Sequence, residues 1–131
     1  MGNSEPVAFE LHPLTGLHYM RSFMNAARIF LEGVQPGAYA MAAIDIEHFR
    51  MINTFCGRDK GDELLVFISD CLKRNMKEHG GVAGHFNGDD FCIIMPFKLE
   101  LFRAIWDEIA ARMGQQSGIA HSLPAIGIYT L

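Results

Sequence analysis

An Asn-Gly pair, Asn87-Gly88, separates two short apolar segments and marks the middle of this chain as a β-hairpin. Asn and Gly best tolerate the positive φ angles that a type I′ turn requires at both of its central positions. Two adjacent carboxylates, Asp89 and Asp90, follow where the chain re-enters an apolar strand. Neighbouring carboxylates repel one another unless a cation or hydrogen-bond donors compensate. This segment therefore leaves two alternatives open: a solvated loop tip, or a metal or phosphate site.

The composition describes a single domain of ordinary size. The chain has 131 residues, of which 50% are hydrophobic and 20% charged, so it is expected to fold around one core rather than to be disordered or fibrous. The net charge of −4, with no basic run longer than Lys73-Arg74, argues against a nucleic-acid partner. The longest apolar run, Tyr39–Ile44, is too short for a membrane span, and no secretory signal opens the chain.

Three cysteines, Cys56, Cys71 and Cys92, show no spacing typical of a metal site. Their odd number does not suggest a disulfide framework. We expect them to act as small buried apolar residues in a reducing environment, which predicts a cytoplasmic protein.

The rest of the chain predicts helices and strands around the hairpin. A helix is expected from Thr15, whose side chain can cap its start, to Gly33. Its apolar stripe, assigned to the core, consists of Met20, Phe23, Met24, Ala27, Phe30 and Leu31. The other expected elements are a strand at 39–46, helices at 49–55, 60–77 and 99–113, hairpin strands within 82–95, a loop at 114–117 and a strand at 126–129. Residues 1–11 are interpreted as a linker or an expression remnant.

The order of these elements from Tyr39 is β, α, β, β, α, β, which predicts an α+β, ferredoxin-like sheet with helices on one face and an extra N-terminal helix. In that arrangement the third strand lies between the first and the second and runs against both. Asp45 stands near the end of the first strand, so we expect it beside Asp89 and Asp90 at one edge of the sheet.

Three carboxylates at one edge suit a hard cation with oxygen ligands, such as Mg²⁺. Protein-bound Mg²⁺ commonly completes its shell with water and substrate phosphates, which points to nucleoside triphosphate chemistry. The chain has no phosphate-loop sequence of the G-x-x-x-x-G-K type, so a P-loop fold is excluded.

Several separated motifs resemble the GGDEF domain, the diguanylate cyclase module of bacterial signalling proteins. They are His12-Pro13-Leu14-Thr15-Gly16-Leu17, the segment Asp45–Asn53, Gly57, Gly61-Asp62 and Asn87-Gly88-Asp89-Asp90-Phe91, and they keep the family's order and spacing. The resemblance covers nearly the whole chain, from His12 to Tyr129. It implies the palm-like βαββαβ core of nucleotidyl cyclases, in agreement with the order of elements.

The resemblance also implies a reaction. Two GTP molecules would condense into cyclic di-GMP, each presented by one subunit of a homodimer. Asp45, the backbone carbonyl of Ile46, Asp89 and Asp90 would hold Mg²⁺ or Mn²⁺, and the three aspartates would also be the catalytic residues.

By the same resemblance, Asn53 and Asp62 would read the guanine edge, because buried polar groups reject bases that leave them unpaired. Phe49 would line the base pocket, Arg50 would meet phosphate, and Gly88 completes the nucleotide-binding set. A purely structural role stays open for three of these: Phe49 as a core residue, and Asn53 and Asp62 as helix-end caps.

The chain departs from the family pattern at several positions. They are His12 in place of Asp, Tyr19-Met20 in place of Asn-Arg, His85 in place of Arg, Asn87 in place of Gly and Asp90 in place of the usual Glu. The shorter carboxylate at Asp90 is the most serious, since a shift of about 1 Å in a catalytic group can cost ~10²-fold in rate. The family's inhibitory R-x-x-D motif would fall on Glu78 and Gly81, so that motif is missing here.

The family's last helix would lie beyond Leu131, so residues 12–131 are interpreted as a GGDEF domain lacking its final helix. Three hypotheses follow. The chain is a diguanylate cyclase domain of reduced activity, or a degenerate GTP-binding module that regulates a neighbouring signalling domain such as a cyclic di-GMP phosphodiesterase, or a scaffold domain that binds no nucleotide.

Overall fold

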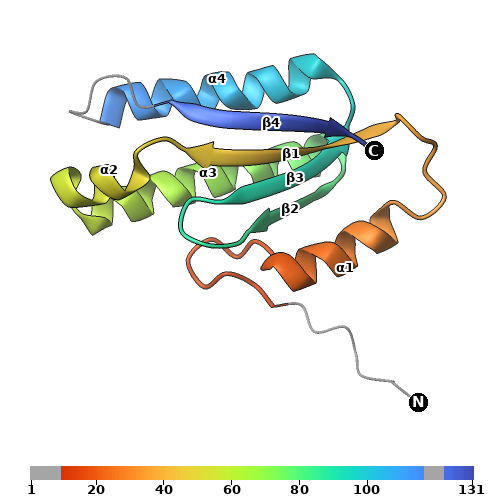
Figure 1. The fold of residues 1–131 in the computed structure, drawn as a ribbon, viewed down its shortest axis with the longest axis horizontal. Helices are drawn as coiled ribbons and strands as arrows, with labels where there is room; N and C mark the ends of the chain where they lie inside the picture. The colour runs from red at the N-terminus through yellow and green to blue at the C-terminus, as the bar shows by residue number, and fades with distance from the viewer. Residues whose placement is uncertain (1–9, 117–122) are drawn as a thin grey trace.

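The computed structural model describes residues 10–116 and 123–131 and contains a four-stranded antiparallel sheet in the order β2-β3-β1-β4 (Figure 1). The strands are β1 (Tyr39–Ile46), β2 (Val82–His85), β3 (Phe91–Pro96) and β4 (Pro124–Thr130). The predicted third strand, β3, lies between β1 and β2 and is antiparallel to both. The predicted α+β fold and its strand order are therefore confirmed.

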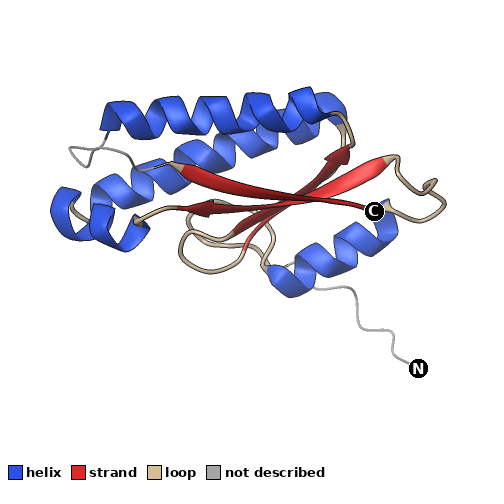
Figure 2. Ribbon diagram, turned by 45° about the horizontal axis from the view of Figure 1, so that its top comes forward, coloured by secondary structure: helices blue, strands red, loops and turns tan. Residues whose placement is uncertain are grey.

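The helices lie on both faces of the sheet, as Figure 2 shows. They are α1 (Met20–Phe30), α2 (Phe49–Cys56), α3 (Arg58–His79) and α4 (Leu99–Gln116). The two long helices, α3 and α4, cover one face, and α1 lies on the other. The short helix α2 joins β1 to α3 and lies beyond the end of β1 (Figure 1). Among the described residues, no helix is both long enough and apolar enough to cross a membrane.

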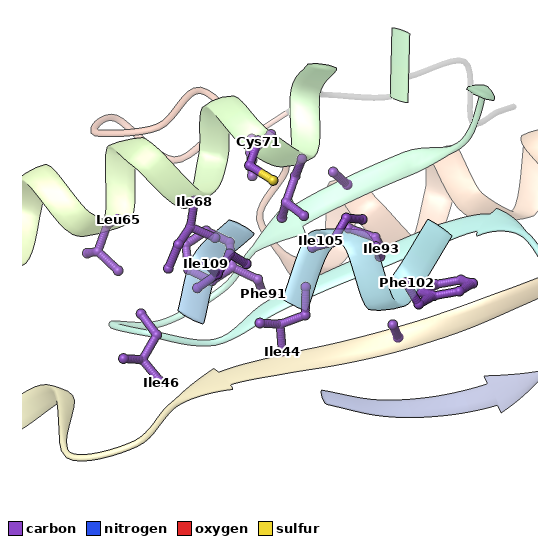
Figure 3. Close-up of a cluster of buried hydrophobic side chains, with 14 of the residues drawn as sticks. Ile44, Ile46, Leu65, Ile68, Cys71, Phe91, Ile93, Phe102, Ile105 and Ile109 are labelled. Carbon is purple, nitrogen blue, oxygen red and sulfur yellow. The ribbon is translucent and has the colours of Figure 1, made fainter. Parts of the chain in front are cut away.

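The main core lies between the sheet and the two long helices (Figure 3). Alternate residues of β1, among them Ala42, Ile44 and Ile46, are buried in this core. Since successive side chains of a strand point to opposite faces, Asp45 faces away from α3 and α4. Burying each of the two isoleucine side chains stabilises the fold by roughly 1.5–3 kcal/mol. The packing that fixes β1 therefore also fixes the direction of the Asp45 carboxylate.

A smaller core joins α1 to the opposite face of the sheet. Phe23 and Ala27 pack there against a group made up of Val82, Cys92 and Ile94. Burial raises the pKa of the Cys92 thiol to about 11, and it raises the pKa of the Cys71 thiol in the main core to about 12. Both cysteines are therefore protonated apolar residues at neutral pH, as predicted.

The predicted start of the first helix at Thr15 is wrong. The helix begins at Met20, after Tyr19, and no side chain caps it. Thr15 is buried in the preceding loop, where its hydroxyl lies 3.0 Å from Nδ1 of His85. The predicted apolar stripe is also only partly buried, because Met20 and Met24 are 56% and 62% exposed.

The predicted two-residue type I′ turn is also wrong, although the hairpin is present. Five residues, 86–90, connect β2 and β3, and only Gly88 among them has a positive φ, of 45°. The amide of Phe86 donates to the carbonyl of Asp90 (2.8 Å), and the amide of Asp90 donates to that of Asn87 (2.7 Å). The loop is wider because Asp89 turns towards β1 and accepts a hydrogen bond there.

The strand predicted at 39–46 has the predicted bounds, and the helix predicted at 49–55 is one residue longer. The third helix and the last strand each extend beyond the prediction by one to two residues at each end. The last helix continues to Gln116, so residues 114–116 of the predicted loop are helical, and residue 117 lies outside the described residues. Most of the predicted linker, residues 1–9, lies outside them as well.

Candidate metal and nucleotide site

Three carboxylates meet at one edge of the sheet. Asp45 comes from the penultimate position of β1, and Asp89 and Asp90 come from the β2–β3 loop, which lies beside the end of β1 in Figure 1. One oxygen from each can be chosen so that all three lie within 4.8 Å of one another. The strand order thus brings together the three aspartates that the sequence analysis expected to meet.

Asp89 is partly buried and has a raised pKa. Its Oδ2 accepts a hydrogen bond of 3.2 Å from the backbone amide of Ile46. Burial, the hydrogen bond with Asp45 and the charge of Asp45 raise the pKa of Asp89 to about 6, while the Ile46 amide opposes the shift. As the pH falls through about 6, a proton on Asp89 relieves the repulsion between these two carboxylates. A hard divalent ion could replace it, because carboxylate oxygens are its preferred ligands.

One of the four predicted metal ligands, the carbonyl of Ile46, comes from the backbone. Its side chain is buried in the main core, and its amide points to Asp89. These contacts place the peptide of Ile46 next to the carboxylates, and ligation by the carbonyl stays a prediction.

A cleft of about 510 Å³ opens beside Asp89. Its lining consists of Phe49, Arg50, Asn53, Thr54, Arg58, Gly88 and Asp89. The structure therefore brings together four of the five predicted nucleotide-binding residues with one predicted metal ligand. Thr54 and Arg58 were not predicted from the sequence to line a site. Arg58 is the first residue of α3 and follows Gly57, whose φ of 93° reverses the chain between the two helices.

Asn53 has an unusual environment in this cleft. Its Oδ1 is buried and has no hydrogen-bond partner among the described residues. A buried acceptor without a partner costs about 1–3 kcal/mol, so an unpaired acceptor beside a cleft is a good candidate for binding a ligand. No side chain caps the start of α3, so the structure gives no support to a capping role for Asn53.

Gly61 of α3 makes room for this amide. A Cβ at position 61 would lie 1.8 Å from Oδ1 of Asn53 and 3.4 Å from the ring of Phe49. Phe49 is partly buried and packs against the main core, so it has the structural role that the sequence analysis left open, in addition to its place in the cleft wall.

Asp62, the other predicted guanine reader, does not line this cleft. It lines a separate hollow on α3 together with the acidic residues Asp59, Glu63 and Asp70. Burial lowers the pKa of His12, and the negative charge of Asp62 offsets part of that shift. A direct role of Asp62 towards the base thus stays a prediction, without the support that the cleft gives to Asn53.

The carboxylates also border a second, more apolar hollow of about 590 Å³ between α1 and the sheet. Asp45, Asn87 and Asp90 stand at its edge, and Met20 and Met24 contribute to its wall. Asp89 faces the first cleft instead. The acidic cluster therefore lies between two hollows: a ligand in the first cleft would meet Asp89, and one in the second would meet Asp45 and Asp90.

The fold and the site define a palm-like α+β domain with an acidic cluster at the end of its first strand. The family described as "Diguanylate cyclase, GGDEF domain" matches residues 11–129. The chain belongs to the GGDEF family, as the motifs predicted.

Curated relatives include a diguanylate cyclase and a cyclic di-GMP phosphodiesterase. Diguanylate cyclase DgcP of Pseudomonas aeruginosa is 30% identical over 105 residues, which are 76% of this chain and 15% of DgcP. The cyclic di-GMP phosphodiesterase NbdA of the same organism is 32% identical over 83 residues, or 62% of this chain and 10% of NbdA. This chain therefore corresponds to a small part of each relative.

Solved structures share the fold. A sensory box/GGDEF family protein from Caulobacter crescentus superposes with a TM-score of 0.71 at 22% identity, covering 92% of this chain and 83% of that one. The GGDEF domain of DgcB from the same organism, solved in complex with c-di-GMP, gives a TM-score of 0.70 at 18% identity, covering 90% of this chain and 75% of that one.

Proposed function

We propose that this chain is a GTP-binding GGDEF domain built for the diguanylate cyclase reaction, with a rate reduced by its Asp90. One observation carries the proposal: Asp45, Asp89 and Asp90 converge next to a cleft in which the acceptor of Asn53 is buried and unpartnered.

The residues of the site fit a nucleoside triphosphate with a divalent ion. Guanine presents N–H donors on its Watson–Crick edge, and Oδ1 of Asn53 is an acceptor in need of a donor. Arg50 and Arg58 give the same cleft positive charge suited to phosphates. The carboxylate oxygens suit Mg²⁺ or Mn²⁺, which would neutralise the triphosphate when bound.

In the reaction, the 3′-hydroxyl oxygen of one GTP forms a bond to the α-phosphorus of another, and the bond to pyrophosphate breaks. Asp45 and Asp89 would hold the divalent ion, which would supply neutralisation of the phosphate charge, and Asp90 accepts the hydroxyl proton. Two such bonds close the ring of cyclic di-GMP, which calls for two domains facing each other and therefore a homodimer. The predicted cytoplasmic location supplies both GTP and the ion.

A second candidate is a regulatory module that binds GTP without turning it over. Two residues favour it: Asp90 is shorter than the usual Glu, and Asn87 adds a side chain to the hairpin loop. Such a module would act on a neighbouring domain, for example a cyclic di-GMP phosphodiesterase, the activity for which the relative NbdA is named.

Calorimetry with GTP and with ATP, each with Mg²⁺, tests the proposal, and chromatography for cyclic di-GMP separates the two candidates. We expect binding that prefers GTP and is lost in Asp45→Ala. Product formation supports the cyclase, whereas binding without product supports the regulatory module. Unchanged GTP affinity in Asp45→Ala would overturn the metal assignment, and equal affinity for ATP would overturn guanine recognition.

A further inference from the structure

We propose that His85 is a positioning residue that, together with Thr15, holds the β2–β3 loop and so fixes Asp89 for metal binding. The inference rests on the proposed function, since it concerns the same carboxylates. His85 is the last residue of β2 and is 0% exposed. Its Nε2 lies 2.6 Å from the carbonyl oxygen of Gly88, the residue before Asp89.

The hydrogen bonds of His85 define the state of its ring. The carbonyl of Gly88 can only accept, so Nε2 carries a proton and donates it. In the neutral ring Nδ1 then has a lone pair, so the Thr15 hydroxyl donates to Nδ1 over 3.0 Å. Burial lowers the pKa of His85, which agrees with the neutral form.

Two other rings fix the plane of this imidazole. The ring of His12 stacks on one side with centroids 3.9 Å apart and planes 14° apart. The ring of Phe91 stacks at 4.2 Å and 9°. His12 is itself held by a hydrogen bond of 3.1 Å from the amide of Leu14 to its Nδ1. A ring held in one plane presents its Nε2–H in one direction, which is what positioning the loop requires.

Thr15 ties this ring to the rest of the fold. Its carbonyl accepts a hydrogen bond of 3.2 Å from the hydroxyl of Ser69, which is buried on α3. The amide of His85 also donates to the carbonyl of His18 over 2.8 Å. The loop before α1, helix α3 and strand β2 therefore all converge on the side chain that binds Gly88.

The Gly88 carbonyl that His85 binds belongs to the residue directly before Asp89, a predicted metal ligand. Gly88 has a φ of 45°, and nothing lies within 4 Å of where a Cβ would be, so side-chain packing does not restrain it. The next residue, Asp89, is restrained on the far side by the amide of Ile46. Loss of the His85 contact would release the backbone that precedes Asp89, so its carboxylate, then restrained by the Ile46 amide, could shift relative to Asp45. Loss of such supporting contacts typically weakens metal binding about 10–100-fold.

His85→Leu, His85→Gln and Thr15→Val test the inference through Mn²⁺ affinity measured by electron paramagnetic resonance. We expect at least tenfold weaker binding in His85→Leu, partial rescue in His85→Gln, whose amide keeps an N–H donor, and a smaller loss in Thr15→Val. His79→Leu, a histidine at the end of α3, is the matched control and should bind Mn²⁺ like the unaltered chain.

If folded His85→Leu or Thr15→Val binds Mn²⁺ with wild-type affinity while Asp45→Ala abolishes binding, the positioning role of His85 is overturned and the proposed metal site stands. Unchanged affinity in Asp45→Ala would overturn the proposed metal site instead. If the substitutions unfold the chain, ¹⁵N NMR spectra of the His85 ring in the unaltered protein test the inference instead. A neutral ring protonated at Nε2 supports the inference, and a proton at Nδ1 contradicts it.

Discussion

The backbone amide of Ile46 donates a hydrogen bond of 3.2 Å to the carboxylate of Asp89, across 43 residues of sequence. This contact joins the end of β1 to the hairpin loop and places two negative groups, Asp45 and Asp89, within hydrogen-bonding reach. In the absence of a cation, the arrangement costs free energy whenever both are ionised. That cost makes both stability and metal binding depend on pH.

The first prediction concerns stability without metal. The pKa of Asp89 rises from 3.8 to about 6 on folding, so the folded chain binds this proton more tightly than the unfolded chain. The contribution is present below pH 3.8 and is lost as pH rises through 6. After allowance for solvent screening it is on the order of 1 kcal/mol. Urea unfolding from pH 4 to 7.5 should show it as a difference between the unaltered chain and Asp89→Asn, whose neutral side chain removes this dependence. Parallel stability curves for the two would contradict the prediction.

The second prediction concerns metal binding, which should become stronger as the pH rises, whereas the metal-free stability becomes weaker. A divalent ion competes with the proton on Asp89, so Mn²⁺ affinity should increase as pH rises through about 6, where the pKa lies. Adding Mn²⁺ at pH 7.5 should raise the melting temperature, and at pH 5 the rise should be much smaller. Asp70→Asn removes an exposed carboxylate outside the cluster and is the control that should keep the pH dependence. A pH-independent affinity would place the ion elsewhere.

The third prediction concerns Gly61. In Gly61→Ala the new Cβ would lie 1.8 Å from Oδ1 of Asn53, so the amide must leave its place in the cleft. We expect GTP affinity to fall at least tenfold and the preference over ATP to disappear, as measured by calorimetry.

Gly114→Ala is the matched control for this substitution. It lies in α4, and a Cβ there would meet nothing within 4 Å. Ala is favoured over Gly in a helix by roughly 0.5–1 kcal/mol, so this variant should be slightly more stable and bind GTP normally. Normal guanine preference in Gly61→Ala would show that Asn53 does not read the base.

The sequence predicted the sheet because its signals are local. The apolar run of β1 and the Asn-Gly pair identify strands, and the order of elements leaves few topologies, so the meeting of Asp45 with Asp89 followed. The failures involve long-range contacts. Thr15 has the residue type of a helix cap, but its hydroxyl binds His85, 70 residues away. The turn is not type I′ because Asp89 bonds to Ile46, a partner that the hairpin sequence alone does not reveal.

The lining of the cleft was likewise only partly predictable from the sequence. Asn53 and Phe49 were found because the family motif carries them, whereas the positions of Arg58 and Asp62 depend on the angle between α2 and α3. Gly57 sets that angle with a φ of 93°, and a sequence pattern indicates a break there but not its direction. The result is that Arg58 enters the cleft and Asp62 lines another hollow.

The last prediction concerns the length of the Asp90 side chain. Asp90 is exposed at the rim of the carboxylate cluster, so a longer side chain can be accommodated there without disturbing the core. Asp90→Glu adds one methylene and moves the carboxylate outward by about one bond length, and a displacement of that size can change a rate ~10²-fold. We expect cyclic di-GMP formation by the longest form of the protein that carries this domain to rise at least tenfold, measured by chromatography, with GTP affinity changed little. Asp70→Glu, on the exposed surface of α3, makes the same chemical change away from the site and should have no effect. If Asp90→Glu binds GTP and still forms no product, the shorter carboxylate is not what limits turnover, and the regulatory function becomes the better account of the site.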